Sequence, residues 1–223
     1  MQDDPARLKN YFLKGYSMVL ALTVPITVAC ALFADDITLV LLGPKWTAAA
    51  PIFRLLAPTI VVFAIANPLF WLLSSLGLVG RSLKMSFVIA PVMIVSYLIA
   101  IPYGPRGVAF AYSAAMVLWV IPLIVWAVHG TAISVRDILL TVGRPIGSAV
   151  VAAGLAFGFR FFCGSLFPPL GRLVLETFVL SITFLAVVLF AAGQKDLYLD
   201  VFRGLMGSSS NASVNTLQKS EAS

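Results

Sequence analysis

Six long apolar segments, separated by short polar ones, make up most of this 223-residue chain. A helix needs roughly 20 apolar residues to cross the hydrocarbon core of a bilayer, which is about 30 Å thick, and the segments reach about that length. Charged residues are nearly absent inside them and gather between them. The pattern predicts an all-α fold, a polytopic transmembrane helical bundle of about six spans, at residues 15–34, 51–80, 85–103, 108–128, 145–163 and 173–192.

The polar segments around the spans carry further expectations. Residues 4–16 alternate charged with apolar positions and predict an amphipathic helix that leads into the first span. Residues 133–140 are also amphipathic, and we expect them to lie along the membrane interface. A tight turn is expected at residues 104–107. The transmembrane domain is expected to cover residues 1–203, and the polar, serine-rich residues 204–223 are expected to form a disordered tail.

The composition excludes a water-soluble globular domain. Hydrophobic residues make up 61% of the chain and charged residues 11%, whereas a soluble domain is usually about 25% charged. Six spans use nearly the whole length, so no separate soluble catalytic domain fits. The formal net charge is +6, but the basic residues lie between the spans rather than in one stripe. This arrangement indicates contact with membrane lipid and control of topology, not nucleic-acid binding.

The distribution of Lys and Arg over the polar segments predicts the orientation. One side of the membrane receives Arg7, Lys9, Lys14, Arg81, Lys84, Arg136, Arg144, Lys195, Arg203 and Lys219. The other side receives Lys45, Arg54, Arg106, Arg160 and Arg172. Because the more basic side of a membrane protein faces the cytoplasm, both termini of this multi-pass chain are expected there.

No arrangement of residues predicts an enzyme. The single histidine, His129, lacks the convergent partners that a metal site needs, and no glycine loop that cradles phosphate occurs. We therefore expect no catalytic residue, no metal and no cofactor. Cys30 and Cys163 both lie in apolar segments; buried free thiols are the expected state, and a disulfide between them is the alternative.

A few polar residues near the spans are candidates for a substrate path. Arg54 and Arg160 lie near the outer ends of their spans, and guanidinium groups pair with phosphate. The alternative is that these arginines snorkel to the interface, and that Glu176 complements a helix dipole. Lys84, at the inner end of its span, is placed to meet an anionic substrate from the cytoplasm.

The second span carries the best candidate for a break in a helix. Asn67 and Pro68 lie in its middle, and discontinuous helices expose backbone groups where substrates bind; a harmless kink is the alternative. The fifth span has small residues at four-residue spacing, which permit close helix packing. They are Ser148, Ala152 and Ala156 on one face, and Gly154 and Gly158 on another.

Several stretches in order resemble the C-terminal part of bacterial polysaccharide flippases, the lipid-linked-oligosaccharide exporters of the multidrug/oligosaccharidyl-lipid/polysaccharide superfamily. The element Leu41-Leu42-Gly43-Pro44-Lys45-Trp46 is the most specific of them. The others are Asp4-Pro5-Ala6-Arg7-Leu8, Pro25, Ala48 to Pro51 with Arg54-Leu55, Ser74 to Arg81, Tyr103-Gly104, Gly107-Val108-Ala109, Ala111-Tyr112, Arg136 to Leu139 and Arg144-Pro145.

The resemblance implies a bacterial inner-membrane protein that moves a lipid-linked oligosaccharide for exopolysaccharide or lipopolysaccharide biosynthesis. Such flippases usually have twelve or more spans in two lobes, so we expect this chain to be a fragment that works with an N-terminal lobe, or with a polysaccharide polymerase. The alternatives are a drug/cation exporter of the same fold, which would normally need an acidic residue within the membrane, and a non-transporting membrane scaffold of polysaccharide assembly. Membrane lipid is the remaining expected partner.

Overall fold

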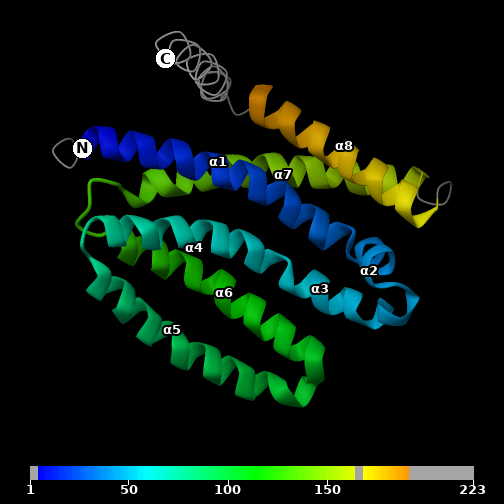
Figure 1. The fold of residues 1–223 in the computed structure, drawn as a ribbon, viewed down its shortest axis with the longest axis horizontal. Coiled ribbons are helices and arrows are strands. Elements are labelled where there is room, and N and C mark those ends of the chain that lie inside the picture. Colours follow the sequence, from blue (N-terminus) through cyan, green and yellow to red (C-terminus); the bar gives the residue numbers. More distant parts are fainter. Residues whose placement is uncertain (1–4, 164–167, 191–223) are drawn as a thin grey trace, which may run out of the picture.

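The computed structural model describes residues 5–163 and 168–190 and shows a bundle of long helices (Figure 1). In chain order the helices are α1 (Pro5–Leu32), α2 (Ala34–Leu42), α3 (Ala50–Leu56), α4 (Pro58–Ser75), α5 (Val79–Ala100), α6 (Gly104–Val128), α7 (Val135–Cys163) and α8 (Pro169–Phe190). Two short 3₁₀ helices, η1 (Pro44–Ala49) and η2 (Ile101–Tyr103), join neighbours. Within these residues there is no β-strand, which confirms the all-α fold.

The helices are long and apolar enough to cross a membrane. Five apolar helical stretches qualify within the described ranges, namely Ala6–Leu32, Pro58–Ser75, Val79–Val128, Val135–Phe161 and Pro169–Val188. The third contains 50 residues, which is too long for one crossing. It consists of α5 and α6, which run antiparallel on either side of η2 (Figure 1). The described part of the chain therefore runs along the bundle six times.

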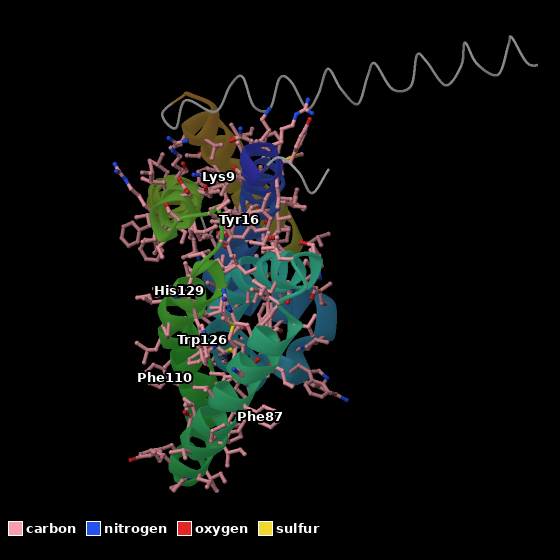
Figure 2. All side chains as sticks on the ribbon, turned by 90° about the vertical axis from the view of Figure 1, so that its left-hand side faces the viewer. Lys9, Tyr16, Phe87, Phe110, Trp126 and His129 are labelled. Carbon is pink, nitrogen blue, oxygen red and sulfur yellow. The ribbon has the colours of Figure 1, made fainter. Side chains whose placement is uncertain are left out.

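The outer surface of the bundle is apolar. Phe87 of α5 is 71% exposed and Phe110 of α6 is 62% exposed, and both side chains lie on the outside of the bundle (Figure 2). Large apolar side chains are exposed along each of the long helices. A contiguous surface of this kind is unstable in water and is suited to contact with lipid. The predicted membrane bundle is thus confirmed.

The first span ends earlier than predicted. The amphipathic lead-in is continuous with the span in one helix, α1, as expected. The span was predicted to run to residue 34, just before Asp35 and Asp36, but α1 ends at Leu32 and both acidic residues lie in the first turn of α2. Phe33 separates the two helices with non-helical backbone angles (φ −103°, ψ 20°). Acidic residues favour the positive N-terminus of a helix, which explains why they begin α2 rather than end α1.

The second span is divided, but not where the sequence predicted. Helix α4 continues through Asn67 and Pro68, so the expected break there is not observed. The Tyr16 hydroxyl donates to the Ile65 carbonyl (3.2 Å) beside this proline. The division lies instead between α3 and α4. Pro58 has no backbone N–H to donate there, and the Ile60 N–H donates to the Ala57 carbonyl three residues before it (3.0 Å).

The second span also ends at Ser75 rather than at residue 80. Gly77 adopts a left-handed conformation (φ +72°). Its N–H donates to the Ser74 carbonyl (3.1 Å), and the Leu78 N–H donates to the Leu73 carbonyl (2.8 Å). This pair of bonds is a Schellman motif, which ends a helix and favours glycine. Residues 79 and 80 therefore belong to α5.

The expected turn at residues 104–107 is already helical. Helix α6 begins at Gly104, and the reversal of the chain takes place in η2. Gly107 then packs so close to the preceding turn that a Cβ added there would lie 2.3 Å from the Tyr103 Cβ. A glycine at this position lets the hairpin between α5 and α6 close tightly.

The amphipathic residues 133–140 do not form a separate interfacial helix. They lead directly into α7, which begins at Val135 and continues through Pro145. Ile133 (4% exposed) and Ile138 (0%) are buried in the bundle. This apolar face packs against neighbouring helices, whereas Leu139 and Leu140 are about half exposed. The position of this segment relative to the membrane interface stays a prediction.

Two apolar clusters hold the bundle together. The larger one joins α1, α4, α5, α6 and the start of α7, around Tyr16, Leu69 and Ile124. The smaller one joins α1, α7 and α8, with Ala152 and Ala156 of α7 fully buried. The predicted close packing of the Ser148, Ala152 and Ala156 face is thereby confirmed.

Some expectations fall on residues that the structure does not describe. The predicted tail, residues 204–223, and the last two residues of the sixth predicted span lie outside the described ranges. So does the side chain of Cys163, while Cys30 is a free thiol.

Candidate functional site

Three arginines and three carboxylates meet at the end of the bundle where α1 gives way to α2, α7 ends and α8 begins (Figure 1). We call this set the arginine–carboxylate network. Its members are Arg54 of α3, Arg160 of α7, Arg172 of α8, Asp35 and Asp36 of α2, and Glu176 of α8. The six formal charges cancel, so the network as a whole is neutral.

Two of the arginines satisfy the C-terminus of α1. The last carbonyls of a helix have no partner within the helix and carry partial negative charge. Arg54 Nε donates to the Ala31 carbonyl (3.1 Å), and Arg160 Nη1 donates to the Leu32 carbonyl (3.0 Å). The break at Phe33 is therefore stabilised from two sides by cations that belong to α3 and α7.

The two aspartates of α2 differ sharply in burial. Asp35 lies near the surface and pairs with Arg54 at 2.5 Å, with both side chains about half exposed (53% and 46%). The Asp36 side chain is 1% exposed and pairs with two arginines: Arg172, and Arg160 at 3.4 Å from Nη2 to Oδ2. A buried carboxylate needs such partners, because leaving its charge unpaired in a low dielectric is costly.

Glu176 is the most deeply buried member of the network. Its side chain is fully buried, and its nearest cation is Arg160, 3.9 Å away. Within the described part of the chain neither of its carboxyl oxygens accepts a hydrogen bond. Helix α8 begins at Pro169, so Glu176 lies about two turns inside it. The dipole interpretation is therefore wrong, since that effect is confined to the first turn.

The structure brings together only part of the predicted substrate path. Arg54 and Arg160 share the network, where both guanidinium groups face carboxylates and backbone carbonyls. Snorkelling of these arginines to the interface stays an alternative. Asn67 is exposed on α4 and Lys84 is exposed on α5; no interaction within the described residues joins either of them to the network.

Sequence reasoning did not identify Asp35, Asp36 or Arg172 as members of the network. The only sequence signal for Asp36 is an acidic pair between two apolar stretches, and the signal for Arg172 is a single cation just before the last span. Neither signal says which side chain it meets, because the Arg172–Asp36 pair joins positions 136 residues apart.

His129 and possible metal ligands are further candidates for a functional site. His129 is exposed at the C-terminus of α6, where its backbone carbonyl accepts a hydrogen bond from Arg81 (2.5 Å). Among the residues that the structure describes, no group of three or more His, Cys, Asp or Glu side chains is placed to hold a metal ion.

Comparison with known proteins gives one match. Residues 1–51 match the profile of a family described as "Polysaccharide biosynthesis protein". This segment covers α1, α2 and η1, and so includes the helix break and both aspartates of the network. No curated protein matches the chain. No solved structure matches it either. The apolar helices and the match together indicate a multi-pass membrane protein with a role in polysaccharide biosynthesis or export.

Proposed function

We propose that this chain takes part in moving a lipid-linked oligosaccharide across the bacterial inner membrane, for exopolysaccharide or lipopolysaccharide biosynthesis. The observation that carries the proposal is the match of residues 1–51 to a polysaccharide biosynthesis family, on a bundle whose helices suit a membrane. The resemblance of its sequence motifs to flippases supports the same role. The role is transport, and we assign no catalytic residue.

The arginine–carboxylate network suggests how the bundle serves such transport. The Arg54–Asp35 pair is half exposed, so its guanidinium is able to exchange the carboxylate for a phosphate oxygen. The pairs around Asp36 are buried and keep the broken helix in place. In this proposal Arg54 contacts the sugar-pyrophosphate head, and Arg160 is a positioning residue.

Transport of this kind needs a second bundle. Alternating access is largely a rocking of one helical lobe against another around a shared site. We therefore propose that this bundle works against an N-terminal lobe, with a polysaccharide polymerase as the alternative partner. The oligosaccharide head would cross between the lobes, while its lipid tail stays in the bilayer.

We further propose that both termini are cytoplasmic. The directions of the helices place two groups of basic residues at opposite ends of the bundle (Figure 1). Seven lie at the end where α1, α5 and α7 begin, namely Arg7, Lys9, Lys14, Arg81, Lys84, Arg136 and Arg144. Five lie at the other end, namely Lys45, Arg54, Arg106, Arg160 and Arg172. The more basic end is expected inside.

Polymer export in a flippase-null strain tests the proposal. We expect the chain to restore surface polysaccharide when an N-terminal lobe is co-expressed, and Arg54→Ala to reduce that export at unchanged protein level. Arg106→Ala is the matched control, because Arg106 is another exposed arginine at the same end and belongs to no ion pair of the network. No restored polymer in any combination would contradict the transport role. Normal export by Arg54→Ala would remove Arg54 from the substrate path.

One observation favours a second candidate, a drug/cation exporter. The sequence places no acidic residue near the middle of a span, but the structure buries Glu176 inside α8. A buried carboxylate within a membrane helix is a common site of ion coupling. Export of a cationic dye that is lost in Glu176→Gln, together with no restored polymer, would favour this candidate over the first.

A further inference from the structure

A pocket of about 500 Å³ lies between the start of α1 and the start of α7, at the end of the bundle opposite the arginine–carboxylate network. Three basic residues line it: Arg7 and Lys14 of α1, and Arg144 of α7. All three are exposed. Among the described residues that line the pocket, none is acidic. The pocket is therefore a hollow with a positive rim, formed by two helices.

The helices hold this pocket in a defined shape. Residues 7 and 14 are two turns apart and share one face of α1. The neighbouring Lys9 forms an ion pair with Asp137 of α7 (2.6 Å), and Figure 2, which looks onto this end, shows Lys9 where α1 lies beside α7. Asp137 also accepts from the Ser134 N–H (2.9 Å) while its own N–H donates to the Ser134 hydroxyl (3.2 Å). This capping box begins α7 here, and the ion pair joins α7 to α1.

The pocket lies at the boundary between the charged and the apolar parts of α1 and α7. Along α1 the charged residues end at Lys14, and the apolar part of the helix follows. Along α7 no charged residue lies between Arg144 and Arg160, which is at the far end of the helix. Tyr11, 68% exposed, borders the pocket on the polar side of this boundary. Basic and aromatic residues at such a boundary meet the headgroup layer of a membrane, where lipid phosphates lie.

We propose that this pocket binds the phosphate of an anionic lipid headgroup. Arg7 and Arg144 supply planar guanidinium groups that match phosphate oxygens in pairs, and Lys14 supplies a compact positive charge. The site is distinct from the arginine–carboxylate network, which lies at the opposite end and is neutral. The inference does not depend on the transport role, because any lipid whose phosphate headgroup has a net negative charge has the chemistry that the pocket recognises.

Calorimetric titration of the purified full chain in neutral detergent tests the site. The probes are short-chain phosphatidylglycerol, a short-chain isoprenyl pyrophosphate, inorganic pyrophosphate and short-chain phosphatidylcholine. The pocket variant combines Arg7→Gln, Lys14→Gln and Arg144→Gln. The control variant removes the same charge elsewhere with Lys45→Gln, Arg106→Gln and Arg136→Gln, which are exposed and do not line the pocket.

We expect the anionic lipids to bind the parent chain and the control variant equally, and phosphatidylcholine to bind more weakly. The pocket variant should bind the anionic lipids about tenfold more weakly or worse, because the loss of even one charge-assisted hydrogen bond has roughly that effect. Tight binding of phosphatidylglycerol would identify the bilayer as the source of the ligand. Binding of the isoprenyl pyrophosphate alone would identify the lipid carrier of the proposed transport.

Equal affinity of the parent and the pocket variant would overturn the site, as would equal weakening in the control variant. Inorganic pyrophosphate that binds as well as the lipids would overturn the assignment to a lipid. The salt dependence of binding by the parent chain is a second test, which does not require the variants to fold. Binding should weaken as salt is raised, since exposed charges are screened, and affinity that is insensitive to salt would contradict the proposal.

Discussion

At the scale of single residues, the same ion-pair chemistry has two different consequences in this protein. The Arg54–Asp35 pair is half exposed, and such pairs contribute little to stability because water and salt screen them. Arg160 faces Asp36 and Glu176, both buried. Removing one partner from a buried set leaves a charge without compensation, which is strongly destabilising. The two arginines that the sequence marks as similar candidates therefore do different things.

Thermal unfolding in detergent separates these two roles. We expect Arg160→Ala to lower the free energy of unfolding by about 3–5 kcal/mol, the range typical of a broken buried pair. Arg54→Ala should lower it by about 1–2 kcal/mol, because it removes an exposed ion pair and one hydrogen bond to the Ala31 carbonyl. Equal, small losses for both variants would show that Asp36 and Glu176 do not depend on Arg160.

The sequence could identify some of these residues but not their contacts. Arg54 and Arg160 stand out because cations are rare in this chain near apolar segments. Their carbonyl partners, Ala31 and Leu32, lie 23 and 128 residues away along the chain. Hydrophobic periodicity carries no information on such distant pairs, so the network could be assembled only from the packed helices.

At the scale of helices, a proline inside an apolar segment does not by itself mark a helix end, although others stand in the first turn of a helix, as Pro58 does in α4. Helices continue through five prolines, namely Pro25, Pro68, Pro91, Pro122 and Pro145. In a membrane, backbone groups that a proline frees are satisfied by neighbouring helices or side chains, and a helix is the only economical conformation. One break occurs at Phe33, where there is no proline, and the other between Ala57 and Pro58, where a proline begins α4. The sequence thus predicted how many helical passes there are and roughly where they lie, but misplaced their interruptions.

Two glycines show which helix contacts are tight. A Cβ at Gly107 would lie 2.3 Å from the Tyr103 Cβ, whereas a Cβ at Gly154, within α7, would meet no atom within 4 Å. We expect Gly107→Ala to lower the melting temperature, because the hairpin between α5 and α6 must open to relieve the clash. Gly154→Ala should raise stability by about 0.5–1 kcal/mol, the difference in helix propensity.

The same thermal-unfolding assay in detergent checks this pair. A Gly107→Ala variant as stable as the parent would mean that the hairpin is looser than the structure shows. A destabilised Gly154→Ala variant would mean that another surface packs closely against the Gly154–Gly158 face of α7.

At the scale of the whole molecule, the two ends of the bundle differ in electrostatic character. One end carries the neutral arginine–carboxylate network, and the other carries the basic pocket and the greater number of cations. The class of fold followed from composition and segment length, because both are fixed by the thickness of a bilayer. The pocket could not be predicted in this way, because it depends on which faces of α1 and α7 meet.

The account depends most on the claim that these two ends lie on opposite sides of a membrane. Single cysteines test it directly, in a background with Cys30→Ala and Cys163→Ala. One variant carries Arg136→Cys at the basic end and another carries Lys45→Cys in η1, both at exposed positions. A membrane-impermeant maleimide added to intact spheroplasts should label the variant changed at residue 45, and should label the variant changed at residue 136 only after the membrane is permeabilised. Labelling of both variants in intact spheroplasts, or of neither, would contradict the account.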